Sequence, residues 1–211
     1  MKHRALHIQD ELAEARRPTA TIGTLMNSAE SLAARVRAGD EAAFQMIFDR
    51  YARPLISFIY DQVGERPLAE ELTQETFVRA YKGIGKLRDD SSLSTWLFGI
   101  AKNVARESLR ARRRGGQQVG FDNPAVRLIS DKGVPPDNQL LQEELNTRIR
   151  DALARLDEDK RLVFTLKVLH ERSYEEIAKI TGFSIPKIKI DLHRARVEMR
   201  RLVQPYLEVS Q

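Results

Sequence analysis

The chain contains no cysteine among its 211 residues, which excludes disulfide bonds, thiolate zinc sites and cysteine nucleophiles. No apolar run approaches the ~20 residues that a membrane-spanning helix needs, and no secretory signal pattern opens the sequence. No glycine-rich phosphate loop, Ser/His/Asp arrangement or set of metal ligands stands out. We therefore expect a cytoplasmic protein without membrane insertion, without a metal or cofactor, and without enzymatic activity.

A strand pattern is also missing, so the segments with regular apolar spacing predict an all-α fold. Gly and Pro gather between 115 and 137, as is typical of a flexible tether between separate bodies. We expect two small helical domains joined by a flexible linker. The predicted parts are an N-terminal extension (1–27), an N-terminal domain (28–114), the linker (115–137) and a C-terminal domain (138–211). The role of the extension stays open, as does whether Met26 is the true start.

The net charge of +5 is modest, but the positive charge is concentrated in two segments. Ser94–Arg114 has six Lys or Arg residues and one Glu, and Ile185–Arg201 has six against one Asp and one Glu. The remainder of the chain is therefore net acidic. Two separate basic segments indicate two surfaces that contact phosphate.

The second basic segment belongs to a helix-turn-helix. Ser173 and Glu176 have the spacing of a capping box, Gly182 supplies the turn, and Ser184 should cap the second helix. That helix has an apolar stripe formed by Ile188, Leu192, Ala195, Met199 and Leu202. Its basic side chains lie largely off the stripe, so the helix can enter a major groove. The plainer interpretation is a basic, solvated helix in an ordinary bundle.

Apolar spacing predicts the other core helices. In the N-terminal domain, Ser28–Ala38 precedes a helix that Asp40 caps, whose aromatic residues should be core and which Pro54 should kink or divide. In the C-terminal domain, helices over Leu141–Leu156 and Asp157–Leu169 should pack against the helix-turn-helix to make a four-helix domain.

A helix from Pro67 to about Tyr81 carries acidic and amide side chains on one side, namely Glu70, Glu71, Gln74 and Glu75. Acid near a helix start favours the helix dipole, which is the plainer explanation. Gln74 and Glu75, however, lie beyond the first turn. Because an acidic face makes a poor DNA surface, we expect it to meet a basic protein partner.

The first basic segment should follow a loop at Lys82–Leu93 as a helix that Ser94 caps. Lys102, Arg106, Arg110 and Arg113 form a basic stripe along this helix. Asn103 lies beside the stripe and can read a base edge. Trp96, the only tryptophan, is either a core residue or an aromatic that stacks on an unpaired base.

Three stretches together resemble the extracytoplasmic-function (ECF) sigma factors, the compact initiation subunits of bacterial RNA polymerase. Ala69–Phe77 is similar to the family's polymerase-docking motif, and Asp90–Asn103 to its promoter-melting and minus-ten segment. Leu192–Arg196 is similar to the end of its minus-thirty-five recognition helix. The resemblance covers about Ser28 to Tyr206, and the order of the motifs, with the tether between the second and third, makes it specific.

The resemblance implies a subunit that binds core polymerase, recognises minus-ten and minus-thirty-five elements and melts DNA to start transcription of a specific, stress-related gene set. The implied partners are the coiled coil of the largest polymerase subunit, the flap of the second-largest subunit, promoter DNA and an anti-sigma factor. The polymerase contacts would be Glu70, Glu71, Gln74, Glu75 and Phe77. The minus-ten and melting contacts would be Ser91, Ser92, Trp96, Lys102, Asn103, Arg106, Arg110 and Arg113. The minus-thirty-five contacts would be Ser184, Lys187, Lys189, Arg194 and Arg196.

The chain departs from the family pattern in both DNA-contacting segments. Leu87 and Leu93 stand where the family often has Phe, which argues against aromatic stacking from that loop. Pro186 changes the usual small-residue pattern of the recognition helix, and Asp191 stands where a basic residue is usual. A carboxylate there would repel phosphate but can accept a hydrogen bond from a cytosine amino group. We therefore expect an atypical upstream promoter element.

Two other functions stay open on the sequence alone. A dimeric helix-turn-helix regulator acting on duplex DNA would leave the basic stripe beside Trp96 unexplained. A helical adaptor that binds only proteins would leave both basic segments unexplained. Polymerase binding separates these alternatives, because a sigma factor should bind core polymerase tightly and free promoter duplex poorly.

Overall fold

The computed structural model describes residues 29–87, 93–115 and 147–207, and every regular element within those ranges is helical. In order, the labelled elements are α3 (Ala29–Arg37), α4 (Glu41–Val63), α5 (Arg66–Gly83), the 3₁₀-helix η1 (Ile84–Lys86), α6 (Leu93–Arg114), α8 (Glu158–Phe164), the π-helical turn η3 (Thr165–Leu169), α9 (Tyr174–Thr181) and α10 (Ile185–Leu207). Residues 147–155 form a further helix. The all-α prediction is confirmed. In these ranges no helix has the length and apolarity to cross a membrane.

Local sequence signals set the ends of α4. The side chain of Asp40 accepts a hydrogen bond from the amide of Ala43 at 3.1 Å, as expected of a helix cap. At the other end Gly64 takes a φ of 79° and donates its amide to the carbonyl of Tyr60, a conformation that side chains disfavour. The helix therefore begins and ends where capping chemistry allows.

Pro54 lies inside α4 and does not divide it. A proline within a helix removes one hydrogen bond and costs about 3 kcal/mol. Around it, Tyr51, Leu55 and Phe58 are all buried. Burial of one large apolar side chain contributes about 1.5–3 kcal/mol, so packing along this face offsets the cost of the proline.

The predicted loop at Lys82–Leu93 is shorter than expected. Helix α5 continues to Gly83, and η1 follows directly. Ile84 and Leu87 are buried, which explains why this segment stays ordered as part of the core. The next helix, α6, begins at Leu93, one residue before the expected cap at Ser94. Residues 88–92 lie outside the described ranges.

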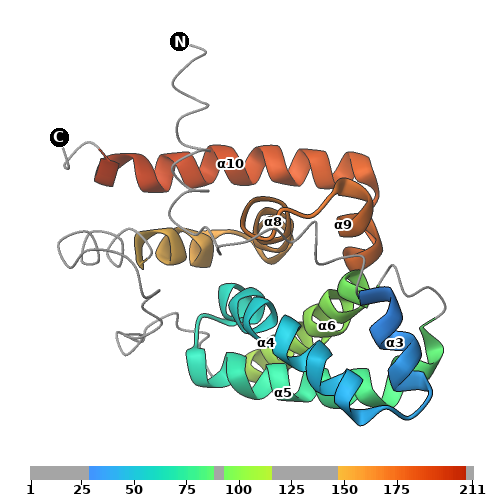
Figure 1. Ribbon diagram of the computed structural model, residues 1–211. Helices are drawn as coiled ribbons and strands as arrows, with labels where there is room; N and C mark the ends of the chain where they lie inside the picture. Colours follow the sequence, from blue (N-terminus) through green and yellow to red (C-terminus); the bar gives the residue numbers. More distant parts are fainter. Residues whose placement is uncertain (1–28, 88–92, 116–146, 208–211) are drawn as a thin grey trace, which may run out of the picture.

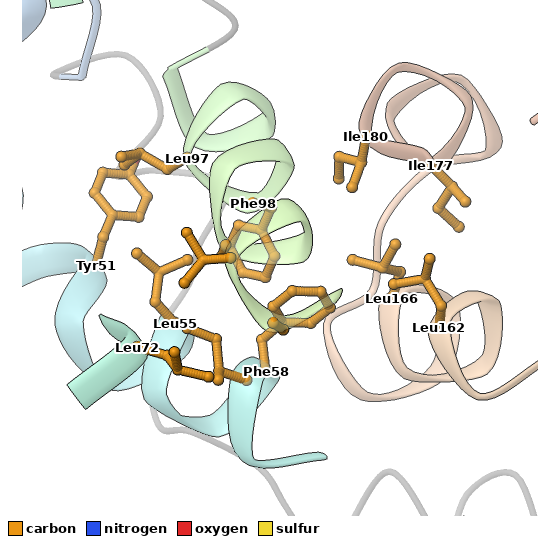
Figure 2. Packing of buried hydrophobic residues seen from close by; sticks show 14 of the residues in the cluster. Tyr51, Leu55, Phe58, Leu72, Leu97, Phe98, Leu162, Leu166, Ile177 and Ile180 are labelled. Atoms are coloured by element: carbon orange, nitrogen blue, oxygen red, sulfur yellow. The ribbon is translucent and has the colours of Figure 1, made fainter. Parts of the chain in front are cut away.

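The N-terminal half (α3 to α6) and the C-terminal half (from 147 to α10) correspond to the two expected helical domains, and they pack against each other. Figure 1 shows the C-terminal half above the N-terminal half, and α6 packs on α9 while α4 packs on α8 and η3. Phe58 and Phe98 lie on the side of the N-terminal core that faces Leu162 and Leu166 (Figure 2). The ring centroids of Phe58 and Phe98 are 5.1 Å apart. The ring centroid of His170 lies 5.7 Å from that of Phe58 and 5.3 Å from that of Phe98. The linker prediction at 115–137 lies almost wholly outside the described ranges.

Candidate polymerase and nucleic-acid interfaces

The outer face of α5 carries the residues predicted to bind polymerase. Glu71 and Gln74 are exposed, and Val78 and Tyr81 continue the same stripe with exposed fractions of 46% and 53%. Spacings of three and four residues place all four on one side of the helix. The face is therefore acidic near the start of α5 and apolar near its end.

The other predicted acids on α5 already have partners. Arg66 Nε lies 2.6 Å from Glu70 Oε1, and Arg79 Nε lies 2.7 Å from Glu75 Oε1. Arg79 also reaches Glu107 of α6, at 2.8 Å. Within the described ranges Glu71 is thus the acid of this face that no ion pair occupies.

Phe77 does not present its ring to a partner, contrary to its assignment as a polymerase contact. It is 4% exposed, and its ring packs on Phe44 and Phe48 of α4, at 6.3 and 4.7 Å between centroids. Its role is to support the face from beneath. Phe48 and Met46 are themselves 38% and 49% exposed, so the apolar end of the face extends onto α4. The sequence predicts Phe48 as a core residue, although the apolar positions of α4 are too many for one buried stripe.

The predicted minus-ten residues lie along α6, but they are not equally available. Asn103, Arg110 and Arg113 are exposed. Lys102 and Arg106 are half-buried, and burial, with the nearby charge of Arg106, lowers the pKa of Lys102. The structure thus confirms one long basic helix. Ser91 and Ser92 lie outside the described ranges.

Arg106 forms ion pairs with acidic residues of the C-terminal half. Its Nε lies 2.8 Å from Glu158 Oε1, and its Nη2 lies 2.7 Å from Asp159 Oδ1. Arg113 also reaches Glu158, at 3.5 Å. Contacts between residues this far apart in sequence leave no local signal, so they cannot be predicted from the sequence.

Trp96 fits both interpretations in part, as a core residue and as an aromatic side chain open to a partner. It is half-buried and packs against the core. A β-carbon placed on Gly83 would lie 3.3 Å from its Cζ2, so the indole lies closely against the end of α5. The remaining exposed part of the ring lies at the start of α6.

The helix-turn-helix forms as predicted. Ser173 Oγ accepts from the amide of Glu176 at 3.1 Å, and the Glu176 carboxylate accepts from the amide of Ser173 at 2.8 Å. Gly182 takes a φ of 77° and ends α9. Along α10, Ile188, Leu192, Ala195 and Met199 are buried against the domain. Helices α8 and α9 both pack on α10, which confirms the packing expected for this domain.

We expect Glu176→Ala to lower the free energy of unfolding by about 1 kcal/mol, since it removes half of a capping box. Burial acts to raise the pKa of Glu176, but hydrogen bonds from the Ser173 amide and from Arg172 outweigh it and lower that pKa. A carboxylate whose pKa is lowered by folding stabilises the folded protein at pH values above its unfolded-state pKa of ~4.3. This stabilisation is lost as the pH falls through the folded-state pKa. Urea titrations at pH 7 and pH 3 should therefore show the wild type losing its advantage over Glu176→Gln in acid. An equal difference at both pH values would contradict this.

Asp191 is paired within the protein, which argues against the expectation that it accepts a hydrogen bond from cytosine. It is 9% exposed, and its carboxylate is hydrogen-bonded to Lys187 one turn earlier. Lys187 Nζ also lies 3.0 Å from Asp159 of α8. The hydrogen bond to Asp191, and the further one to Asp159, raise the pKa of Lys187. The i,i+4 spacing of Lys187 and Asp191 is the signal that could have revealed this pair.

The other predicted minus-thirty-five residues lie on or near a mixed face of α10, which carries both basic and exposed apolar side chains. Ser184, Lys189 and Arg194 are exposed, and Arg196 is half-buried. Ser184 accepts from the amide of Lys187 at a long 3.4 Å, so its cap is weak. Ile190 and Val197, which no sequence motif marks, are 52% and 53% exposed on α10.

Comparisons with known proteins agree with this arrangement. The model of sigma-70 region 2 matches residues 47–115, and that of sigma-70 region 4 matches residues 146–199. The RNA polymerase sigma-H factor of Pseudomonas aeruginosa is 30% identical over 183 residues, which are 84% of this chain and 95% of that protein. The ECF RNA polymerase sigma-E factor of Escherichia coli K12 is 32% identical over 183 residues, 83% of this chain and 94% of that protein. The chain belongs to the ECF sigma factors of RNA polymerase.

Solved structures share this fold. RpoE of Bartonella quintana, solved with the anti-sigma factor NepR, is 26% identical with a TM-score of 0.63, covering 76% of this chain and 96% of that one. CnrH, solved with the cytosolic domain of CnrY, has a TM-score of 0.64 at 21% identity, covering 84% of this chain and 97% of that one.

The family matches distribute the surfaces of this sigma factor between two regions. Region 2 holds most of α4 together with α5 and α6, so it contains both the acidic face and the first basic helix. Region 4 holds the helix-turn-helix. As a sigma factor the protein is an initiation subunit of RNA polymerase, and the alternative of a dimeric duplex-binding regulator finds no support.

Proposed function

We propose that this sigma factor docks on core polymerase through the outer face of α5, against the coiled coil of the largest subunit. The exposed, unpaired Glu71 supports this, together with Gln74 beside it and the apolar Val78 and Tyr81 further along. A basic helical partner with apolar positions would find charge at one end of this face and apolar surface at the other. Phe48 of α4 would extend the apolar part.

We assign the exposed side of α6 to the minus-ten element and to strand opening. Arg110 and Arg113 can hold the phosphate backbone, and Asn103 can read a base edge. A base flipped from the non-template strand would lie beside Trp96 at the start of the helix. Unstacking costs a few kcal/mol per base, which stacking on the indole and hydrogen bonds would offset.

We assign α10 to the major groove at the minus-thirty-five element, with the C-terminal domain lying near the flap of the second-largest subunit. Lys189 and Arg194 are exposed there and suit phosphate or guanine contacts. Ile190 and Val197 are exposed apolar side chains of the kind that contact thymine methyl groups. Because Asp191 is occupied by Lys187, we expect the upstream element to be read by this mixed face.

Arg194→Ala should weaken promoter recognition and leave polymerase affinity unchanged. A base-contacting arginine is worth about 1–3 kcal/mol, so transcription at limiting promoter should fall by roughly fivefold to a hundredfold. Arg201→Ala, an exposed basic residue nearer the end of α10, is the matched control. Equal losses of promoter and polymerase binding would show that Arg194 is structural.

We further propose that an anti-sigma factor holds this protein inactive in the cytoplasm. One structural neighbour, RpoE of Bartonella quintana, was solved with such a partner. The same exposed surfaces that bind polymerase and DNA would be available to it. The protein would carry out no catalytic step of its own, since bond formation belongs to the polymerase.

The observation that carries the proposal is the presence of an acidic-apolar face and a basic helix on one region, with a basic helix-turn-helix on the other. Titrating labelled protein with purified core polymerase tests it. We expect tight binding to core, and binding to promoter DNA only in its presence. Tight binding to duplex DNA without core would contradict the proposal.

A further inference from the structure

His170 lies between the two halves, directly after the π-helical turn η3. Its side chain is only 10% exposed, and its Nε2 lies 3.9 Å from Oδ2 of Asp61, near the end of α4. The side chain of Asp61 has no exposed surface. A charged group that is buried to this degree needs opposite charge or hydrogen bonds. His170 therefore brings a titratable group from one half to a buried carboxylate of the other.

Two phenylalanine rings of the N-terminal half enclose the imidazole. The ring of His170 meets that of Phe58 at an interplanar angle of 81° and that of Phe98 at 67°. Neither phenylalanine has any exposed surface. Apolar walls strengthen the attraction between charges, because little water screens them. Burial alone disfavours a charged imidazole, whereas a carboxylate within roughly 4–6 Å favours it.

The other charges near this corner have partners of their own. Arg172, two residues after His170, lies 3.0 Å from Glu176 of α9 and has its Cζ 4.3 Å above the ring of Phe98. Arg150, from the helix at 147–155, lies 5.7 Å from the ring centroid of Tyr60. The pairing of Arg172 with Glu176 reduces its repulsion of a charged imidazole. The attraction of Asp61 therefore decides which form of His170 is favoured.

The backbone around His170 departs from ordinary helical geometry. Its amide donates to the carbonyl of Thr165 at 3.0 Å across the π-helical turn. The next residue, Glu171, takes a φ of 52°, a left-handed conformation that residues other than glycine seldom adopt. Such irregularities gather at functional sites. Here they turn the chain so that His170 meets α4 and α6.

We propose that His170 and Asp61 form a proton-dependent joint between the two halves. With the imidazole protonated, the joint is an ion pair between the end of η3 and α4. When the proton leaves, Asp61 loses the positive charge opposite it, so the contact weakens. The joint is therefore fully formed below the ordinary histidine value of about 6.5. It is lost as the pH rises through the value in the folded protein, which the carboxylate places higher.

The joint makes the placement of the two halves respond to pH near neutrality. Since α6 belongs to one half and α10 to the other, the position of one basic helix relative to the other changes with the same proton. The consequence for promoter contacts rests on the proposed function, whereas the pair itself does not.

A double-mutant cycle of His170→Gln and Asp61→Asn tests the pair, by urea unfolding of the full-length protein at about pH 6 and about pH 8.5. Both replacements remove the charge and keep hydrogen-bonding groups. In the control cycle, His193→Gln on α10, an exposed position, takes the place of His170→Gln. We expect the two sites to couple by about tenfold in the unfolding equilibrium constant at the lower pH. The coupling should nearly vanish at the higher pH, and the control should be additive at both.

The distance between the halves tests whether this pair acts as a joint. Because the sequence has no cysteine, spin labels can be attached solely at Gln45→Cys on α4 and Arg200→Cys on α10, both exposed positions. We expect one narrow distance at about pH 6 and a broader distribution with longer distances at about pH 8.5. His170→Gln should give the broader distribution at both pH values, and His193→Gln should follow the wild type.

A coupling of the same size at both pH values would overturn the proton dependence, since a purely structural contact does not titrate. A distance distribution that stays the same at both pH values would overturn the joint. Neither result affects polymerase binding, which the titration with core polymerase measures separately, so failure of this inference and failure of the proposed function are distinguishable.

Discussion

Glu71→Lys should weaken binding of core polymerase roughly a hundredfold, which corresponds to about 2.7 kcal/mol. Glu71 is exposed, and no ion pair holds it within the described part of the chain, so its replacement removes no internal contact. Placing a lysine against a basic coiled coil adds like-charge repulsion, which costs several kcal/mol at an interface. Anisotropy titration of the labelled protein with core polymerase measures the effect.

The matched control is Asp151→Lys, an exposed acid of the C-terminal half that undergoes the same change of charge. It should bind core polymerase like the wild type. Equal weakening in both variants would show that net charge alone governs binding, and the assignment of the α5 face would fall. Glu75→Lys is a poorer test, because it would also break the pair with Arg79.

Phe98→Ala should lower the free energy of unfolding by about 3–5 kcal/mol, the usual cost of emptying a buried phenylalanine site. Phe98 has no exposed surface, and its ring contacts Phe58 of its own half and His170 of the other. Natural domains have a free energy of unfolding of about 5–15 kcal/mol, so the variant should lose a large share of its stability. Urea unfolding followed by circular dichroism measures the loss.

A double-mutant cycle with Arg172→Ala shows whether this contact between the halves exists in solution. Phe98 and Arg172 touch, so their effects should be non-additive by at least ~0.5 kcal/mol. Leu55→Ala removes an equally buried residue of α4 and should combine additively with Arg172→Ala. Additivity in both cycles would contradict the packed arrangement of the halves.

Signals that act within a few residues were readable from the sequence. The capping box at Ser173 and Glu176, the turn at Gly182 and the cap at Asp40 all depend on neighbours three or four positions away. Pro54 was harder to judge, because its local cost is outweighed by burial that the whole N-terminal half supplies. Phe77 was likewise predicted to be exposed, because the burial of its ring depends on two aromatic residues of α4 that are distant in sequence.

Contacts across the chain could not be predicted. Arg106 belongs to a regular basic stripe, and nothing in that stripe indicates that Glu158 and Asp159 of α8 occupy it. The helical prediction for α6 was confirmed, whereas the availability of its charges depends on how the halves dock. The pairing of Asp191 could have been predicted, because its partner Lys187 is one helical turn away and pairs of this spacing are common on helices.

Run-off transcription with purified core polymerase and genomic DNA fragments, with and without this protein, tests the central claim most directly. The account predicts new start sites that require the protein, and aligning the sequences upstream of them should give both promoter elements. Glu71→Lys should abolish these starts, and Arg194→Ala should weaken them while core binding persists. Tight binding to core polymerase without any dependent start on any fragment would contradict the assignment of α6 and α10 to promoter recognition.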